Sequence, residues 1–310
     1  MVMATDESAG PDAPRVLYYG HYDVQPVQPL EEWGHPPFDG VVIDGPRGKR
    51  IVARGASDDK GQLMTFVEAI RAWKSVHGAL PVRVVILLEG EEESGSESLV
   101  PFLNEHREEL LADTCIVCDT SMWDEDTPAI TSRLRGLVYI EASLHGPSHD
   151  LHSGGYGGSV INPANALTKI LGQLHDDDGR VQLDGFYDDV DEVSSEQIEQ
   201  WNSLGDADVL VLESSGAKAI HGEQGFGTLE RLWSRPTCDI NGLWAGYTGE
   251  GAKTVIGATA SAKISCRLVA SQNPQKIEGS LFAFLEERTP EGCHWTLKSY
   301  GASPAIAVPT

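Results

Sequence analysis

Two properties that this sequence lacks narrow its possible partners. It has no apolar run of about 18 residues, the length that a membrane-spanning helix requires, so we expect no membrane association. It also has few basic residues relative to acidic ones: 23 against 47, which gives a formal net charge of -24. Such a surface repels nucleic acid and anionic lipid. We therefore expect neither nucleic acid nor a membrane as a partner.

Cysteine is scarce as well, and its five copies are irregularly spaced, which argues against a disulfide framework. Cys115 and Cys118 have the C-x-x-C spacing of redox and zinc motifs. They lie in an apolar strand pattern without a second pair, so we interpret them as residues of a buried strand. Residues 1–14 have neither the basic start nor the apolar core of a signal peptide. These features favour a cytoplasmic location.

The first part of the chain alternates strand and helix patterns. The expected elements are strands at 15–20, 82–88 and 114–118 and helices over 61–74 and 96–111. This alternation is typical of a βαβ layer with parallel strands. We place a first domain at residues 1–134.

The second part has a different order of predicted strands and helices. The expected elements are strands at 136–145, 238–244, 254–270 and 294–300, a helix from Asn162-Pro163 to about Leu174, and a helix opened by Asn273-Pro274. The order β-α-β-β-α-β is the ferredoxin-like arrangement. The acidic stretch 176–199 is poorly periodic, and we expect it to be exposed. We place this second domain at 135–303, with 304–310 as the start of a further segment.

Polar side chains follow the apolar strands of the first domain. His21 and Asp23 come after the first strand, Glu91-Glu92-Glu93 after the second, and Asp119 after the third, while Asp58-Asp59 precede a helix. Ligands of open α/β sheets bind outside the carboxyl ends of the strands. Imidazole and carboxylate together suit borderline divalent cations, zinc foremost.

Each of these groups has an ordinary explanation when it is taken alone. Asp58 could cap a helix, the glutamates could form a solvated charge run, and Asp119 could belong to a turn. Coincidence is a poor explanation for all of them at one sheet edge. Adjacent glutamates can also divide the work, since one can bind a cation while the other takes a proton from water.

Several segments, in the same order along the chain, carry a family resemblance. They are residues 19–26 (YGHYDVQP), 54–61 (RGASDDKG), 92–96 (EESGS), 134–136 (LRG), 150–154 (DLHSG), 251–256 (GAKTVI) and 267–269 (RLV). On these segments the chain resembles the dinuclear zinc metallopeptidases. That family includes cytosolic carnosine-type dipeptidases, glutamate carboxypeptidases, and acetylornithine deacetylase or succinyl-diaminopimelate desuccinylase. The segments at 24–26, 150–154 and 251–256 favour the dipeptidase branch.

The resemblance implies roles for residues of the first domain. It implies two divalent cations, with zinc foremost and manganese or cobalt as alternatives. Their implied ligands are His21 and Asp119 on one cation, Glu93 on the other, and Asp58 as the bridge between them. Glu92 would be general base and then general acid, and Asp23 would orient His21. The resemblance also implies a cis peptide bond between Asp58 and Asp59.

In the second domain, the resemblance implies that His152 stabilises an oxyanion in the partner subunit's active site. It also implies that Thr254 and Arg267 hold the carboxylate of a small dipeptide substrate, and that the chain is a homodimer. Without the resemblance, His152 would be interpreted as a loop histidine and Arg267 as part of a salt bridge at a strand end.

We therefore expect an α/β fold, with a zinc-peptidase-like (phosphorylase/hydrolase-like) catalytic domain followed by a ferredoxin-like α+β dimerisation (lid) domain. The expected function is metal-dependent hydrolysis of dipeptides or related N-acyl amino acids. The resemblance implies that the chain returns to the first domain after about residue 304 with another metal-binding histidine. Because the sequence ends at residue 310, we expect an incomplete catalytic domain. The alternatives are an inactive, truncated remnant that acts only through its dimerisation domain, and an N-deacylase or carboxypeptidase.

Overall fold

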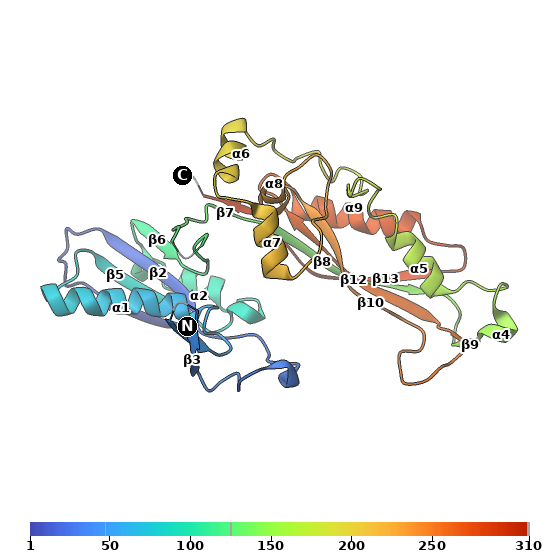
Figure 1. Ribbon diagram of the computed structural model, residues 1–310, viewed down its shortest axis with the longest axis horizontal. Coiled ribbons are helices and arrows are strands. Elements are labelled where there is room, and N and C mark those ends of the chain that lie inside the picture. The colour runs from blue at the N-terminus through green and yellow to red at the C-terminus, as the bar shows by residue number, and fades with distance from the viewer. Residues whose placement is uncertain (47, 125, 309–310) are drawn as a thin grey trace. The chain divides into compact units, whose positions relative to one another are not determined.

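Two sheets organise the chain, one in each of two units, Met1–Ile130 and Thr131–Thr310 (Figure 1). The computed structural model describes residues 1–46, 48–124 and 126–308. Among these residues, no helix has both the length and the apolar character that crossing a bilayer requires.

The first unit contains a four-stranded sheet with helices between its parallel strands. Its elements are β1 (Val2–Asp6), β2 (Arg15–His21), a 3-10 turn η1 (Leu30–Glu32), β3 (Val41–Gly45), β4 (Gly48–Val52), α1 (Lys60–His77), β5 (Arg83–Glu89), a 3-10 turn η2 (Glu92–Ser94), α2 (Leu99–Glu105), α3 (Arg107–Leu110) and β6 (Thr114–Val117). The strand order is β1-β5-β2-β6. β2 runs parallel to β5 and β6, so the carboxyl ends of these three strands share one edge.

Neighbouring residues of β2 pack toward opposite faces of this sheet. Tyr18 stacks on Phe66 of α1, with ring centroids 4.0 Å apart. Leu17 and Tyr19 pack on the cluster around Leu110, which lies in α3. This alternation follows from the two-residue period of a strand, and it gives the unit a helical layer on each face of the sheet.

Local patterns gave an incomplete picture of the first unit. The single helix expected over 96–111 is wrong, because it is divided into α2 and α3 at His106. β1, which pairs antiparallel with β5, and the β3–β4 hairpin were not expected. The interpretation of Cys115 as a buried residue is also wrong, since it is exposed on β6, an edge strand of this sheet.

The second unit contains a four-stranded antiparallel sheet and several helices. Its elements are β7 (Arg133–Leu134), β8 (Gly136–His145), β9 (Leu151–His152), α4 (Ser153–Tyr156), α5 (Pro163–Leu171), α6 (Ser195–Asn202), α7 (Ala207–Ser215), α8 (Thr228–Trp233), β10 (Thr237–Ala245), β11 (Val255–Ile256), β12 (Thr259–Leu268), α9 (Pro274–Glu287), β13 (His294–Ser303) and β14 (Ile306–Ala307). The sheet order is β10-β12-β8-β13. Helices α5 and α9 pack on this sheet, which gives the expected ferredoxin-like arrangement.

The stretch 176–199 differs from its expectation. Val181, Leu183 and Phe186 are buried in the core of the second unit, although the sequence around them is acidic. Gln272 holds this segment in place, because its side-chain amide donates to the Phe186 carbonyl over 2.7 Å. Helices α6, α7 and α8 were not expected either, and the strand expected over 254–270 is divided into β11 and β12.

Candidate metal centre

The carboxyl ends of β2, β5 and β6 bring the predicted ligands of the first unit together. His21 is the last residue of β2, and Asp119 follows β6. Glu92 and Glu93 lie in η2, directly after β5. Asp58 lies just before Asp59, the N-cap residue of α1. The parallel pairing of the three strands therefore places all of these side chains at one edge of the sheet.

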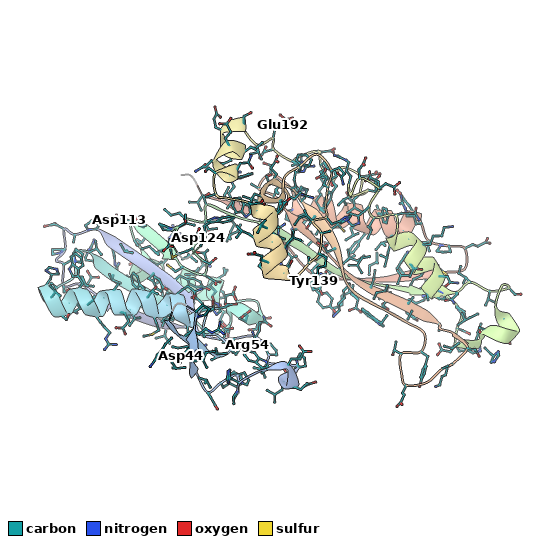
Figure 2. All side chains as sticks on the ribbon, viewed as in Figure 1. Asp44, Arg54, Asp113, Asp124, Tyr139 and Glu192 are labelled. Atoms are coloured by element: carbon teal, nitrogen blue, oxygen red, sulfur yellow. The ribbon has the colours of Figure 1, made fainter. Side chains whose placement is uncertain are left out.

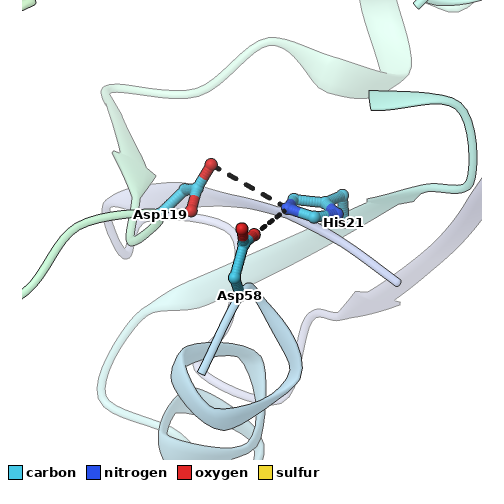
Figure 3. A group of neighbouring side chains, drawn as sticks. All are labelled: His21, Asp58 and Asp119. Carbon is cyan, nitrogen blue, oxygen red and sulfur yellow. Dashed lines mark hydrogen bonds and ion pairs between the residues drawn. The ribbon is translucent and has the colours of Figure 1, made fainter. Parts of the chain in front are cut away.

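His21, Asp58 and Asp119 form the cluster drawn in Figure 3, and each offers one ligand atom within 4.8 Å of the others. The Nε2 atom of His21 lies 3.0 Å from Asp58 Oδ1 and 3.9 Å from Asp119 Oδ2. One imidazole and two carboxylates are ligands that zinc accepts, and three protein ligands leave a coordination position open. The residues present therefore fit a divalent cation.

Burial differs sharply between the two sides of this cluster. The His21 side chain is 0% exposed, whereas the Asp58 side chain is 64% exposed. The imidazole therefore forms the inner wall, and the Asp58 carboxylate faces solvent. A ligand cluster that is buried on one side and open on the other can admit a substrate from the open side.

Electrostatics show that the cluster holds an excess of negative charge. Burial raises the pKa of Asp119, and the nearby Asp58 carboxylate raises it further. Burial acts to lower the pKa of His21, but the neighbouring carboxylates of Glu92 and Asp119 outweigh it, and the net shift is upward. A bound cation would relieve this repulsion between carboxylates.

The residue after Asp58 supports the backbone of the site. The peptide bond between Asp58 and Asp59 is cis, which confirms the sequence prediction. Asp59 is fully buried, and its Oδ2 accepts a hydrogen bond of 3.2 Å from the His21 amide. Its other oxygen, Oδ1, is buried without a partner among the described residues. Asp59 thus links the start of α1 to the end of β2.

Asp23 lies behind His21 and contacts two loops. Its Oδ1 lies 3.4 Å from His21 Nδ1, and its Oδ2 accepts a 2.9 Å hydrogen bond from the Glu93 amide. The hydrogen bond of His21 Nδ1 is with the Asp23 backbone carbonyl, over 3.2 Å. Partners of this kind on the second ring nitrogen orient an imidazole ligand.

The two glutamates of η2 have different surroundings. Glu92 Oε2 lies 4.0 Å from His21 Nε2. Burial raises the pKa of Glu92, and Asp119, Glu93 and Asp23 raise it further, although His21 opposes the shift. Glu93 instead contacts Gln25, whose side-chain amide donates to Glu93 Oε2 over 2.7 Å and to the Glu93 carbonyl over 3.3 Å.

Two contributions to this site were missed in the sequence. Gln25 lies within a segment that carries the family resemblance, but no role was assigned to it. Glu89 is fully buried at the end of β5 and accepts a 2.5 Å hydrogen bond from the Tyr19 hydroxyl. The position of Glu89 at the end of an apolar run could have indicated its importance. No local pattern indicated that Tyr19 is its partner.

The predicted residues of the second unit do not form one cluster. The Gly154 amide donates to His152 Nδ1 over 3.0 Å, so the imidazole proton lies on Nε2, which is 3.3 Å from Thr254 Oγ1. Arg267 lies near the other end of β12, beside Leu137 and Thr237. The strand from Thr259 to Arg267 rises about 26 Å, so Arg267 is remote from His152 and Thr254.

Comparisons with known proteins agree with this fold. The Cys-Gly metallodipeptidase dug1 of Schizosaccharomyces pombe is 34% identical over 86% of this chain and 56% of its own length. The Beta-Ala-His dipeptidase of Rattus norvegicus is 30% identical over 89% of this chain and 56% of its own length. The chain thus spans just over half the length of these curated relatives.

Solved structures show the same likeness. The M20 family metallo-carboxypeptidase Sso-CP2 from Sulfolobus solfataricus matches with a TM-score of 0.82 and 35% identity, over 98% of this chain and 67% of that one. Human carnosine dipeptidase 1 matches with a TM-score of 0.82 and 27% identity, over 99% of this chain and 65% of that one. The model of peptidase family M20/M25/M40 matches residues 17–305. This chain belongs to peptidase family M20/M25/M40.

Proposed function

We propose that this chain hydrolyses the peptide bond of dipeptides or of related N-acyl amino acids, with two divalent cations as cofactors. The observation that carries the proposal is the cluster of His21, Asp58 and Asp119, whose ligand atoms lie within 4.8 Å of one another at the open edge of the sheet. Membership of a peptidase family and the names of the relatives, which include dipeptidases, support the same reaction.

Zinc is the cation that we propose, with manganese or cobalt as alternatives. His21, Asp58 and Asp119 would hold one cation, and Asp58 and Glu93 would hold the second. When bound, the cations would supply Lewis-acid activation of water and of the substrate carbonyl.

Glu92 is the residue that we assign to proton transfer. It would take a proton from the attacking water and deliver it to the leaving amine. A general base works best when its pKa is close to the operating pH. Burial raises the pKa of Glu92 in that direction. Its Oε2 lies 4.0 Å from His21 Nε2, so the carboxylate is beside the cluster.

His152 is the residue that we assign to the oxyanion. Because its Nδ1 accepts from the Gly154 amide, its Nε2–H is the donor and can serve a developing negative charge. We propose a C2 homodimer in which His152 of one copy serves the site of the other. Thr254 and Arg267 would bind the substrate carboxylate. Since Thr254 precedes β11 and Arg267 lies near the far end of β12, we propose that the two copies contribute one each.

We also propose that the chain resides in the cytoplasm. All five cysteines, Cys115, Cys118, Cys238, Cys266 and Cys293, are free thiols. Free thiols persist in a reducing compartment.

The test of the proposed function is an assay of the purified chain after its metal has been removed and zinc has been added back. The substrates are Cys-Gly, β-Ala-His and an N-acetyl amino acid. We expect cation-dependent hydrolysis of at least one dipeptide, two zinc ions per chain, and loss of both in Asp58→Asn. The exposed residue Glu97 gives the control variant Glu97→Gln, which should behave as the parent. One zinc or fewer without turnover would instead support an inactive remnant, and activity on the N-acetyl amino acid alone would support a deacylase.

A further inference from the structure

The loop after β2 contacts both of the loops that carry the second cation's proposed ligands. Gln25 lies in this loop and reaches Glu93, which follows β5. Its side-chain amide donates to Glu93 Oε2 over 2.7 Å and to the Glu93 carbonyl over 3.3 Å. Asp23, two residues earlier, accepts from the Glu93 amide over 2.9 Å. The backbone and the side chain of Glu93 are therefore both held from the same loop.

This loop is itself anchored to the segment that leads to Asp58. The Arg54 guanidinium, labelled in Figure 2, donates to the Pro26 carbonyl over 3.0 Å and lies 5.0 Å from the centroid of the Trp33 ring. The Trp33 indole in turn donates to the Val27 carbonyl over 2.9 Å. The two residues that follow Gln25 therefore have their carbonyl groups held by hydrogen bonds.

We propose that Gln25 is a positioning residue for the second cation, which it serves by orienting Glu93. This inference rests on the proposed function, in which Glu93 binds that cation. The Gln25 amide donates to Glu93 Oε2, so Oε1 would be the oxygen that remains available to a cation. Without the amide, the Glu93 carboxylate can rotate, and its negative charge is no longer directed to one place. Loss of a partner that orients a ligand typically costs about 10–100-fold in metal affinity.

The role of Gln25 is confined to one of the two cations. The His21, Asp58 and Asp119 cluster has its own supports, since Asp23 and Asp59 contact His21. Among the described residues, the side-chain hydrogen bonds of Gln25 go to Glu93 and none goes to these three residues. A change at Gln25 should therefore separate the two binding steps, which a general loss of folding would not do.

The experiment is a calorimetric titration of the metal-free chain with Co²⁺, followed in parallel by the visible absorption of the bound Co²⁺. Gln25→Met keeps the length of the side chain and removes the amide. We expect its second binding step to weaken about 10–100-fold while the first step and its absorption band stay unchanged. Gln25→Asn, whose amide is one methylene short of Glu93, should weaken the same step. Gln200→Met changes an exposed glutamine on α6 and should match the parent.

The outcomes distinguish this inference from the proposed function. If the parent and Gln25→Met bind two Co²⁺ ions equally well, the inference is overturned and the two-cation centre stands. If Gln25→Met weakens both steps alike, Gln25 supports the whole edge of the sheet and the inference is again overturned. If the parent binds a single ion, the two-cation centre itself fails, and the inference fails with it.

Discussion

The two units bury their apolar side chains to different extents. In the second unit one cluster joins β8, β12, α5 and α9 with the segment around Phe186. In the first unit the corresponding cluster of buried residues, among those described, is Val85, Leu87 and Leu110. The first unit also exposes apolar side chains on α1 and α2, at the C-cap of α3 and on the edge strand β6. They are Val76 at 74%, Val100 at 64%, Leu111 at 60% and Val117 at 54%.

This difference places the larger hydrophobic core in one unit and the candidate site in the other. The second unit has the larger core and should unfold at the higher temperature, because buried apolar area is the main favourable term in folding. The first unit carries the candidate metal centre on a sheet with a smaller core. Bound cations should therefore stabilise the first unit more than the second, since ligands stabilise the state that binds them.

The largest expected effect is a loss of catalytic rate from a substitution that lies outside both cores. Glu92→Gln should lower kcat for the dipeptide by about 10²–10⁴-fold, the range for loss of a general acid–base group. Zinc binding and the unfolding of both units should stay as in the parent, which calorimetry can check. If Glu92→Gln lost zinc to the same extent as Asp58→Asn, Glu92 would be a ligand and the assignment of proton transfer would be wrong.

The next effect sharpens the comparison between the cores. Phe186→Ala should destabilise the second unit by about 3–5 kcal/mol, because Phe186 is 1% exposed and its ring fills a closed cluster. Leu110→Ala should destabilise the first unit by about 2 kcal/mol, since a small cluster beside exposed groups can collapse more easily. Urea unfolding measures both. The exposed Phe38 gives the control Phe38→Ala, and equal losses at Phe186 and Leu110 would refute the difference between the units.

The smallest effect concerns pH and the first unit alone. Lys74 lies 2.5 Å from Asp6, and its ammonium, with help from Ser8, lowers the pKa of Asp6 to about 2. Because the folded pKa is below the unfolded value of 3.8, this pair stabilises the first unit above about pH 4 and loses its effect as the pH falls through 2. Both groups are partly exposed, so the contribution should be below about 1 kcal/mol.

Asp6→Asn isolates this contribution from the other carboxylates. The variant should be slightly less stable than the parent at pH 6 and equal to it at pH 2, in urea unfolding monitored on the first unit. A difference that persisted at pH 2 would show that the pair does not act through its charge.

The sequence predicted which residues form the candidate site better than it predicted the residues that hold them in place. His21, Asp58 and Asp119 were found because each lies next to an apolar run or a helix start, and parallel strands bring such positions to one edge. The contacts of Gln25 with Glu93 and of Tyr19 with Glu89 join residues about 70 positions apart, which no local pattern reveals. The roles assigned to these residues remain predictions.

The same limit applies to the fold. The β-α-β-β-α-β order was legible because its helices start at Asn-Pro and its strands are apolar. The burial of Val181 and Phe186 was not evident from the sequence, since their neighbours are acidic and the hydrogen bond from Gln272 to Phe186 joins distant parts of the chain. β1 was missed for a similar reason, because its five residues are defined by pairing with β5.

The central place of β2 has a consequence for how the site can move. β2 forms hydrogen bonds with β5 on one side and with β6 on the other, and His21 is its last residue. The ladder with β6 ends at Tyr19, whereas His21 itself pairs with Glu89 of β5, so moving the backbone at His21 would require opening the β5 ladder. The backbone amides of β2 should be among the slowest in the first unit to exchange with deuterium. The carboxylates lie on loops with no such restraint. When a substrate binds, the carboxylate side chains should therefore move more than the imidazole of His21.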